Sequence, residues 1–220
     1  MLSLTHMKIY LSSYHLGNNP EKLKELVNKE NAKAGIVLNA ADNSEDERRA
    51  SYVASQIEEL ATLGIDSEEL DLRNYFNRNQ ELEPKLSSYD LVWVVGGNSF
   101  LLLRAMKQSG FDKLIVPLVE NDTIVYSGFS AGAVVATPTL HGIELVDDKD
   151  TVSEGYDKEV VWTGLHMVGK SIAPHYKSNH PESEAVDEVI KYFLKNGMDY
   201  WTLSDGQALV IKDGTVTLVS

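Results

Sequence analysis

Residues 90–108 read Asp-Leu-Val-Trp-Val-Val-Gly-Gly-Asn-Ser-Phe-Leu-Leu-Leu-Arg-Ala-Met-Lys-Gln. The continuous apolar run at 90–95 predicts a short strand that is buried on both faces. Gly96 and Gly97 end this strand, and residues 100–108 predict a helix. Because a glycine pair leaves backbone N–H groups bare, a ligand can approach closely at this junction between strand and helix.

The same order of a short apolar run and a helical pattern recurs through the first half of the chain. One helix is predicted after Asn19-Pro20, and a second from Ser44, with Glu47 as its capping-box partner, to Gly64. Further strands are predicted at 8–12, 35–40, 65–72 and 123–126, the third near an edge of the sheet because it is more polar. This alternation predicts an α/β fold of three layers, with helices on both faces of a mostly parallel central sheet.

The second half of the chain is less regular. Residues 138–168 have poor periodicity and many acidic side chains, so we expect a long irregular segment with a short strand at 160–162. The remaining pattern predicts a strand at 171–175, a helix at 182–195, a strand at 200–203 and a closing hairpin of 207–212 and 215–219. We predict a single domain over residues 1–220, with residues 1–7 outside the fold.

The composition limits the classes of partner. The 33 acidic and 20 basic side chains give a formal charge of -13, which would repel phosphate backbones and anionic lipids. We therefore expect neither nucleic acid nor a membrane as a partner, and a monomer or a homodimer. The absence of cysteine excludes disulfides and a thiolate nucleophile. Because the start lacks a signal-peptide pattern and no apolar run is long enough for a membrane span, we expect a cytoplasmic location.

Residues 128–132 read Gly-Phe-Ser-Ala-Gly and follow a predicted strand directly. A Gly-x-Ser-x-Gly sequence between a strand and a helix forms a nucleophile elbow, a tight turn that requires small neighbours and exposes the serine hydroxyl. The alternative is that Ser130 only caps the helix. A capping box would need an acidic or amide side chain at the third helical position, where Ala133 stands. We therefore predict that Ser130 is a nucleophile.

A serine nucleophile requires donors for the developing oxyanion. The N–H group of Ala131 directly follows Ser130, and the N–H group of Gly97 lies at the end of a neighbouring predicted strand. The alternative role of Gly97 is packing or helix capping. We expect both N–H groups to form an oxyanion hole.

The nucleophile also requires a base, and His175 is the strongest of the six histidines. It follows the apolar residues of a predicted strand, at the edge where open α/β sheets bind ligands, and Pro174 restricts the chain before it. His180, Glu182 and Glu184 lie nearby, but their spacing matches no metal site that we recognise. We therefore expect no metal and no cofactor.

Three motifs together resemble the peptidase E, or α-aspartyl dipeptidase, family. They are Gly-Phe-Ser-Ala-Gly-Ala at 128–133, Val-Val-Gly-Gly-Asn-Ser-Phe at 94–100 and Pro-His-Tyr at 174–176. The resemblance extends from about Lys8 to the end of the chain. It implies a class I glutamine-amidotransferase-like, flavodoxin-like fold, with a serine where the amidotransferases have cysteine. It also implies that Ser130 is the nucleophile, that His175 is the base, and that Gly97 and Ala131 form the oxyanion hole.

The third catalytic residue has two candidates by this resemblance. Asp205 matches an acidic residue before a glycine near the last strands of the family. Asp147 matches another acidic position to which the role has been assigned. A carboxylate is needed to hold the tautomer of the histidine and to stabilise its cation. We favour Asp205, because a residue at a strand end is held more firmly than one in a loop.

One departure from the family concerns substrate specificity. The family has an arginine after the catalytic histidine that binds the aspartyl carboxylate, whereas residues 180–190 here contain four acidic side chains and no arginine. Lys177 could replace it as a point charge, and we also expect Asn98 to contact the substrate. The sequence thus predicts a serine hydrolase of small peptides, such as a dipeptidase. The alternatives are an esterase or cyanophycinase-like hydrolase on the same fold, and a binding protein whose triad no longer works.

Overall fold

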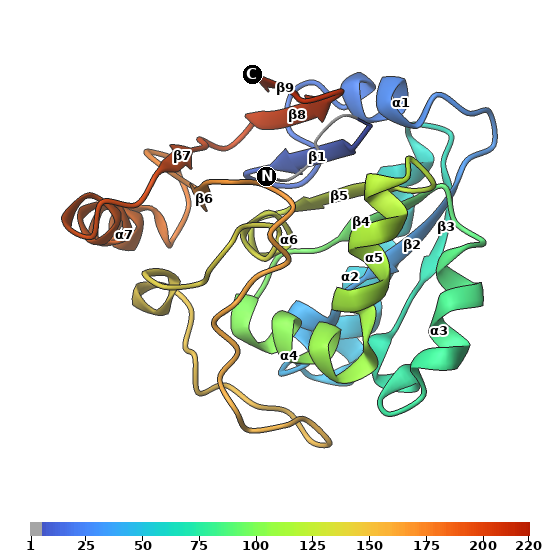
Figure 1. Ribbon diagram of the computed structural model, residues 1–220, viewed down its shortest axis with the longest axis horizontal. Helices are drawn as coiled ribbons and strands as arrows, with labels where there is room; N and C mark the ends of the chain where they lie inside the picture. Colours follow the sequence, from blue (N-terminus) through green and yellow to red (C-terminus); the bar gives the residue numbers. More distant parts are fainter. Residues whose placement is uncertain (1–5) are drawn as a thin grey trace.

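Seven strands form the central sheet in the computed structural model, which describes residues 6–220 (Figure 1). In order across the sheet they are β3 (Asp66–Glu69), β2 (Lys33–Val37), β4 (Leu91–Val94), β5 (Val125–Phe129), β1 (Lys8–Ser12), β8 (Ala208–Lys212) and β9 (Thr215–Val219). The first five are parallel, whereas β8 is antiparallel to β1 and forms the predicted hairpin with β9. A small separate sheet pairs β6 (Ser171–Ala173) with β7 (Tyr200–Thr202). The prediction of a mostly parallel sheet is confirmed.

Helices cover both faces of the central sheet. Within residues 6–220 they are α1 (Glu21–Val27), α2 (Asp46–Ala61), α3 (Asn79–Leu86), α4 (Ser99–Ser109), α5 (Phe111–Glu120), α6 (Ala131–Val134) and α7 (Ser183–Lys195), with short 3-10 helices η1 (Asn39–Ala41), η2 (Leu72–Tyr75) and η3 (Ile143–Leu145). The apolar side chains of α1 and α2 pack in one core cluster, and those of α3, α4, α5, α6 and α7 in another. Figure 1 shows α4 and α5 in front of the sheet and α2 behind it. The expected three layers are therefore present.

Strand β4 shows why its sequence is apolar throughout. Val92 and Val94 pack in the cluster that contains α4 and α5, whereas Leu91 and Trp93 pack in the cluster of α1 and α2. All four side chains are fully buried, as a strand between two helical layers requires. The one polar atom among these side chains, Nε1 of Trp93, donates a 2.8 Å hydrogen bond to Oε1 of the buried Gln56 on α2.

The chain between β2 and α2 differs from its prediction. The predicted strand at 35–40 ends at Val37, because the chain turns into η1, where Oδ1 of Asn39 accepts a hydrogen bond from the N–H of Leu72. The prediction that Ser44 and Glu47 form a capping box is wrong. Helix α2 begins at Asp46 without a side-chain cap, and the N–H of Ser44 instead donates to the carbonyl of Ala41. The long-range hydrogen bond of Asn39 thus accompanies the early end of the strand, whereas a local turn stands where the capping box was predicted.

Residues 138–168 are irregular, as predicted, but the prediction of a short strand at 160–162 is wrong. Within the described part of the chain, pairing here is limited to an isolated antiparallel bridge between Thr139 and Thr163. The range 1–7 also needs correction. Met7 is fully buried in the core, so the fold begins no later than this residue, while residues 1–5 lie outside the described part of the chain.

Buried Arg104 on α4 holds the irregular segment in place. The side chain is 1% exposed, and its guanidinium donates hydrogen bonds to the carbonyl oxygens of Lys149 (2.7 Å), Glu159 (3.0 Å) and Thr151 (3.2 Å). Burial lowers the pKa of Arg104, although this side chain remains charged in proteins. Three carbonyl groups thus replace the water around a buried cation and fix the segment that follows Asp147.

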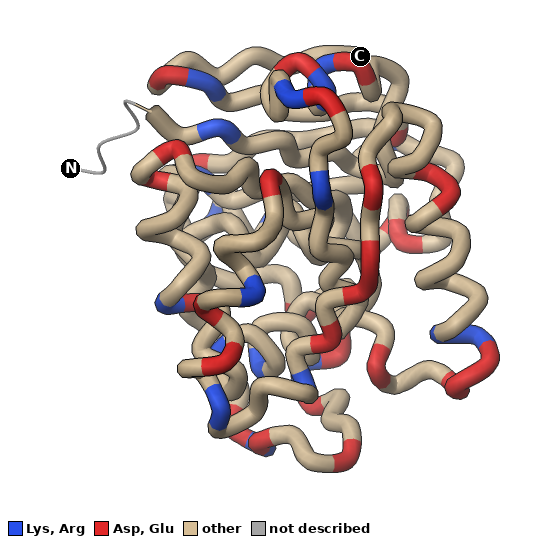
Figure 2. Tube along the Cα trace, turned by 90° about the vertical axis from the view of Figure 1, so that its right-hand side faces the viewer, with Lys and Arg blue, Asp and Glu red and all other residues tan. Residues whose placement is uncertain are grey.

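The excess of acidic side chains is spread along the chain rather than confined to one element (Figure 2). Several of them lie in the irregular segment at 144–159. Among residues 6–220, no helix combines the length and the apolar character that a membrane span requires.

The contact between α6 and β4 gives a prediction about stability. A Cβ atom at Gly132 would lie 2.1 Å from the carbonyl oxygen of Val94, a backbone atom of a central strand. We expect Gly132→Ala to lower the free energy of unfolding by about 1–3 kcal/mol, although alanine ordinarily favours a helix. Urea denaturation would measure the change.

Gly169→Ala is the matched control, because a Cβ atom there would meet nothing within 4 Å. Its free energy of unfolding should stay within about 0.5 kcal/mol of the wild-type value. Equal stability of the two variants would contradict the proposed clash.

Candidate active site

Ser130 occupies the tight turn between β5 and α6. Its backbone φ of 48° and ψ of -115° lie outside the regions that a side chain ordinarily allows. Neighbouring hydrogen bonds hold it there: the N–H of Ser130 donates to the carbonyl of Ser12 (3.2 Å), and its own carbonyl accepts from the N–H groups of Ala133 and Val134 (2.9 Å each). This is the strained geometry of a nucleophile elbow, as the sequence predicts.

His175 follows β6 and lies against Ser130. Its Nε2 atom is 3.0 Å from Oγ of Ser130, and the residue is 1% exposed. The backbone of His175 has a φ of 60°, and its N–H donates a 2.8 Å hydrogen bond to Oγ of Ser13. The two residues, which are 45 positions apart in the sequence, are therefore within the reach that proton transfer requires.

Asp205, in the loop between β7 and β8, meets the other ring nitrogen of His175. Its Oδ1 atom lies 2.8 Å from Nδ1 and also accepts a 2.9 Å hydrogen bond from Oγ of Ser13. The N–H of Asp205 donates to Oγ of Ser178 (2.7 Å). An Nδ1–H group can thus donate a hydrogen bond to Asp205, which leaves the lone pair of Nε2 free to accept from the hydroxyl of Ser130.

Asp147, the other candidate acid, does not contact the histidine. Its Oδ2 atom accepts a 2.8 Å hydrogen bond from the N–H of Ser99, at the first turn of α4. Burial raises the pKa of Asp147 to about 6, against the lowering effect of this hydrogen bond, and the nearby charge of Glu182 raises it further. Asp147 therefore lies near Ser130 as a carboxylate without a cationic partner among residues 6–220.

The environment of His175 favours the neutral form of its imidazole. Burial lowers the pKa of His175 and outweighs the contact with Asp205, which raises it. The ring of His180 stacks on that of His175, with centroids 3.6 Å apart and planes at 8°, and its positive charge would lower the pKa further. A neutral imidazole is the form that can take the proton of a serine hydroxyl.

The N–H groups of Gly97 and Ala131 are available to a ligand. Neither donates a hydrogen bond to any group in residues 6–220. Gly97 is exposed, with a φ of 140°, and a Cβ atom there would lie 2.6 Å from the carbonyl oxygen of Ala40. Only glycine suits this backbone position, so a glycine at 97 is required by the backbone conformation as well as by packing.

The two expected substrate-binding residues lie in different surroundings. Asn98 lines the open cleft at Ser130, but its Oδ1 atom caps α4 by accepting from the N–H of Leu101, and its Nδ2 atom donates to the carbonyl of Asp148. Lys177 is exposed, with its ammonium 5.0 Å from the ring centroid of Tyr176, and it lines neither of the two cavities at Ser130.

His175, His180 and Glu182 bring ligand atoms within 4.8 Å of one another. However, the two imidazole rings lie face to face, and ring nitrogens bind metals in the plane of the ring. Parallel lone pairs cannot converge on one ion unless a ring rotates. The stacked arrangement therefore favours contact between the two rings over coordination of one metal ion by both.

Two cavities meet at Ser130. An open cleft is lined by Ser130, His175 and Gly97, together with Arg48 and Tyr52 of α2. A smaller, mostly apolar pocket lies behind Ser130. Asp147 and Glu182 line both cavities.

Sequence reasoning missed two residues that position this site. Ser13, fully buried at the carboxyl end of β1, contacts both the backbone of His175 and the carboxylate of Asp205. Arg104 fixes the segment after Asp147. The place of Ser13 directly after a predicted strand was the available signal, whereas nothing local distinguishes Arg104 from a surface arginine.

Comparison with known proteins gives consistent matches. The model of peptidase family S51 matches residues 10–219. The chain is 32% identical over 163 residues to an uncharacterized peptidase of Listeria monocytogenes, covering 73% of this chain and 74% of the relative. It is 30% identical over 173 residues to a protein named peptidase E from Streptomyces coelicolor, covering 76% of this chain and 65% of the relative.

Solved structures share the fold. A crystal structure from Listeria monocytogenes, described as a peptidase E protein, superposes with a TM-score of 0.80 at 26% identity, covering 97% of this chain and 98% of the other. A peptidase from an acI-B1 actinobacterium gives a TM-score of 0.65 at 17% identity, covering 98% and 89%, which supports the fold alone.

The contacts of His175 give a prediction about its titration. Asp205→Asn removes the charge that raises the pKa of His175, so the pKa should fall further. His180→Gln removes a charge that lowers it, so the pKa should rise. Imidazole NMR signals followed against pH would measure both shifts.

Asp187→Asn is the control for the loss of one acidic charge, because Asp187 is exposed on α7. It should leave the pKa of His175 unchanged within error. A rise in the Asp205→Asn variant would show that Asp205 does not stabilise the imidazolium.

Proposed function

This chain belongs to peptidase family S51 and is a serine peptidase, and we propose that it hydrolyses dipeptides by acyl transfer through Ser130. The observation that carries the proposal is the continuous line of contacts from Ser130 through His175 to Asp205. The two distances, 3.0 Å and 2.8 Å, fit hydrogen bonds that hold a base between a nucleophile and a carboxylate.

In the proposed first step, Oγ of Ser130 attacks the carbonyl carbon of the scissile amide while Nε2 of His175 takes the hydroxyl proton. Asp205 stabilises the resulting imidazolium through Nδ1–H. The oxyanion of the tetrahedral intermediate accepts hydrogen bonds from the N–H groups of Gly97 and Ala131. When the intermediate collapses, the C–N bond breaks and the leaving amine takes the proton from Nε2.

The second step releases the acyl group. Water occupies the position that the amine has left, and Nε2 of His175 takes its proton as the oxygen attacks the ester carbonyl. Collapse of the second intermediate breaks the bond to Oγ of Ser130, which recovers its proton from His175. The neutral form of His175, favoured by burial, is needed at the start of both steps.

The preference for dipeptides is supported by the charges of the cleft. Arg48 on α2 is exposed, lines the same cleft as Ser130, and forms no ion pair among the described residues. Arg49, by contrast, is paired with Asp42 and Glu69. We propose that Arg48 binds the C-terminal carboxylate of a short substrate. A cytoplasmic location, a monomer or homodimer, and the absence of a cofactor stay predictions.

Ser130→Ala should abolish the proposed activity. Without the hydroxyl no acyl-enzyme can form, so hydrolysis of a dipeptide panel should fall by at least about 10³-fold. A fluorophosphonate probe should label the wild-type protein at Ser130 and leave the variant unlabelled, as mass spectrometry would show.

Ser51→Ala, at an exposed position on α2, is the control and should keep both labelling and turnover. Unchanged hydrolysis in Ser130→Ala would refute the role of the nucleophile. If a folded wild-type protein neither reacts with the probe nor cleaves any dipeptide or ester, the chain is a binding protein on this fold.

Arg48→Gln should weaken the binding of substrates with a free carboxylate. We expect the KM of a dipeptide to rise about two- to tenfold with little change in kcat, because one partly solvated ionic hydrogen bond is lost. The KM of the matching dipeptide amide, which has no carboxylate, should not change. Arg78→Gln, exposed and outside the cleft, is the control. An equal effect on both substrates would contradict this role.

A further inference from the structure

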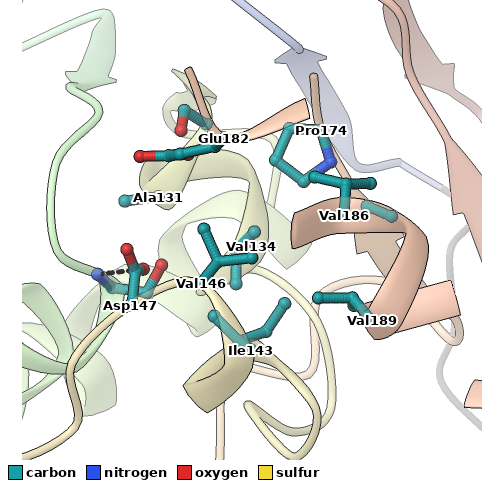
Figure 3. Close-up of a pocket in the computed structure, with 12 residues that line it drawn as sticks. Ala131, Val134, Ile143, Val146, Asp147, Pro174, Glu182, Val186 and Val189 are labelled. Atoms are coloured by element: carbon teal, nitrogen blue, oxygen red, sulfur yellow. Dashed lines mark hydrogen bonds between the residues drawn. The ribbon is translucent and has the colours of Figure 1, made fainter. Parts of the chain in front are cut away.

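The apolar pocket behind Ser130 lies between α6, η3, the end of β6 and α7 (Figure 3). Its floor and one wall are aliphatic side chains, which Figure 3 shows pointing into the same space. They are Val134, Ile143, Val146, Pro174, Val186 and Val189. A cavity that opens beside a nucleophile and has such walls suits an apolar side chain of the group that is acylated onto it.

The charged side chains that line this pocket are all acidic. Asp147 and Glu182 are its charged lining residues, and no lysine or arginine lines it. Figure 3 shows the two carboxylates on the same side of the cavity, with Ala131 between them. The side nearest the nucleophile therefore attracts a cation and repels an anion.

Neither carboxylate is neutralised within residues 6–220. Asp147 accepts a single hydrogen bond, from the N–H of Ser99, and Glu182 approaches only His175 and His180, at 3.9 Å and 4.0 Å. Burial raises the pKa of both side chains, which is the sign of carboxylates that lack a partner. A ligand ammonium placed between them would supply the missing charge.

We propose that this pocket binds the N-terminal residue of the substrate, with an aliphatic side chain in the apolar part and a free α-ammonium between Asp147 and Glu182. This assignment rests on the proposed acyl transfer at Ser130. In an N-terminal residue the α-ammonium and the side chain both branch from the carbon next to the scissile carbonyl. A pocket with carboxylates at its entrance and apolar walls beyond them matches that branching.

The same charges disfavour an N-terminal aspartyl residue. Its side-chain carboxylate would enter a pocket without a cation and close to two like charges. A lysine side chain is the other ligand that carboxylates could attract, but here they stand beside Ala131, next to the nucleophile. An ammonium on the α-carbon reaches that place, whereas the ammonium at the end of a lysine side chain would extend past it into the apolar part.

A dipeptide series with one leaving group tests the assignment. We expect kcat/KM for Val-Gly and Leu-Gly to exceed that for Asp-Gly and Lys-Gly by at least about tenfold. N-acetyl-Leu-Gly, which lacks the ammonium, should be cleaved at least about tenfold less efficiently than Leu-Gly. Glycine release would be measured for every substrate under the same conditions.

Two variants separate the apolar and the charged part. Val146→Phe, at a partly buried position, should reduce kcat/KM for Leu-Gly by about tenfold or more and that for Gly-Gly much less, because the phenyl ring fills the pocket. Val152→Phe, 36% exposed in the same irregular segment, is the matched control and should change neither. Glu182→Gln should raise the KM of Leu-Gly and leave that of N-acetyl-Leu-Gly unchanged.

The outcomes distinguish this assignment from the proposed function. Labelling of Ser130 together with preferred cleavage of Asp-Gly or Lys-Gly, or with equal cleavage of the acetylated substrate, would overturn the pocket assignment alone. Absence of both labelling and hydrolysis would overturn the proposed function and this inference with it. Thermal unfolding of each variant would confirm that it folds, so that a loss of activity reports on the pocket.

Discussion

The site depends on the close approach of the turn after β5 to the end of β4. Gly128 and Gly132 flank Ser130, and a Cβ atom at either would lie 2.6 Å or 2.1 Å from the carbonyl oxygen of Val94. Because no side chain separates these backbones, the turn is forced into the positive φ at which Ser130 projects from the sheet. The glycines therefore fix the position of the hydroxyl, and the helix after it places the N–H of Ala131 beside it.

A second constraint links the strand ends that supply the other groups. Ser13 leaves β1 beside the turn and is bound to both His175 and Asp205, which come from β6 and from the loop before β8. One buried hydroxyl thus holds His175 and Asp205, the proposed base and acid, at a fixed spacing, while burial favours the neutral form of His175. The order of strands brings the three chain segments together, because β1 lies between β5 and β8 in the sheet.

The sequence predicts well what local chemistry determines. Continuous apolar runs identify the central strands, and the small residues around Ser130 identify the elbow, because both are properties of neighbouring residues. Asp205 rather than Asp147 contacts His175, and which of the two loops reaches the histidine depends on packing between residues far apart in the chain. Ser13 and Arg104 were missed for the same reason: each has an ordinary local sequence and acquires its role only from distant partners.

The charges of the proposed subsites also relate to the charge of the whole protein. A dipeptide of two uncharged side chains is a zwitterion without net charge, so the formal charge of -13 neither attracts nor repels it at a distance. Its two ends differ locally: the ammonium suits the carboxylates of Asp147 and Glu182, and the carboxylate suits Arg48 across the same cleft. A longer peptide would carry its carboxylate past Arg48. An aspartyl dipeptide would add a negative charge that both the pocket and the whole molecule disfavour, so in the proposed binding mode the same arrangement of charges would select for length and for the first side chain.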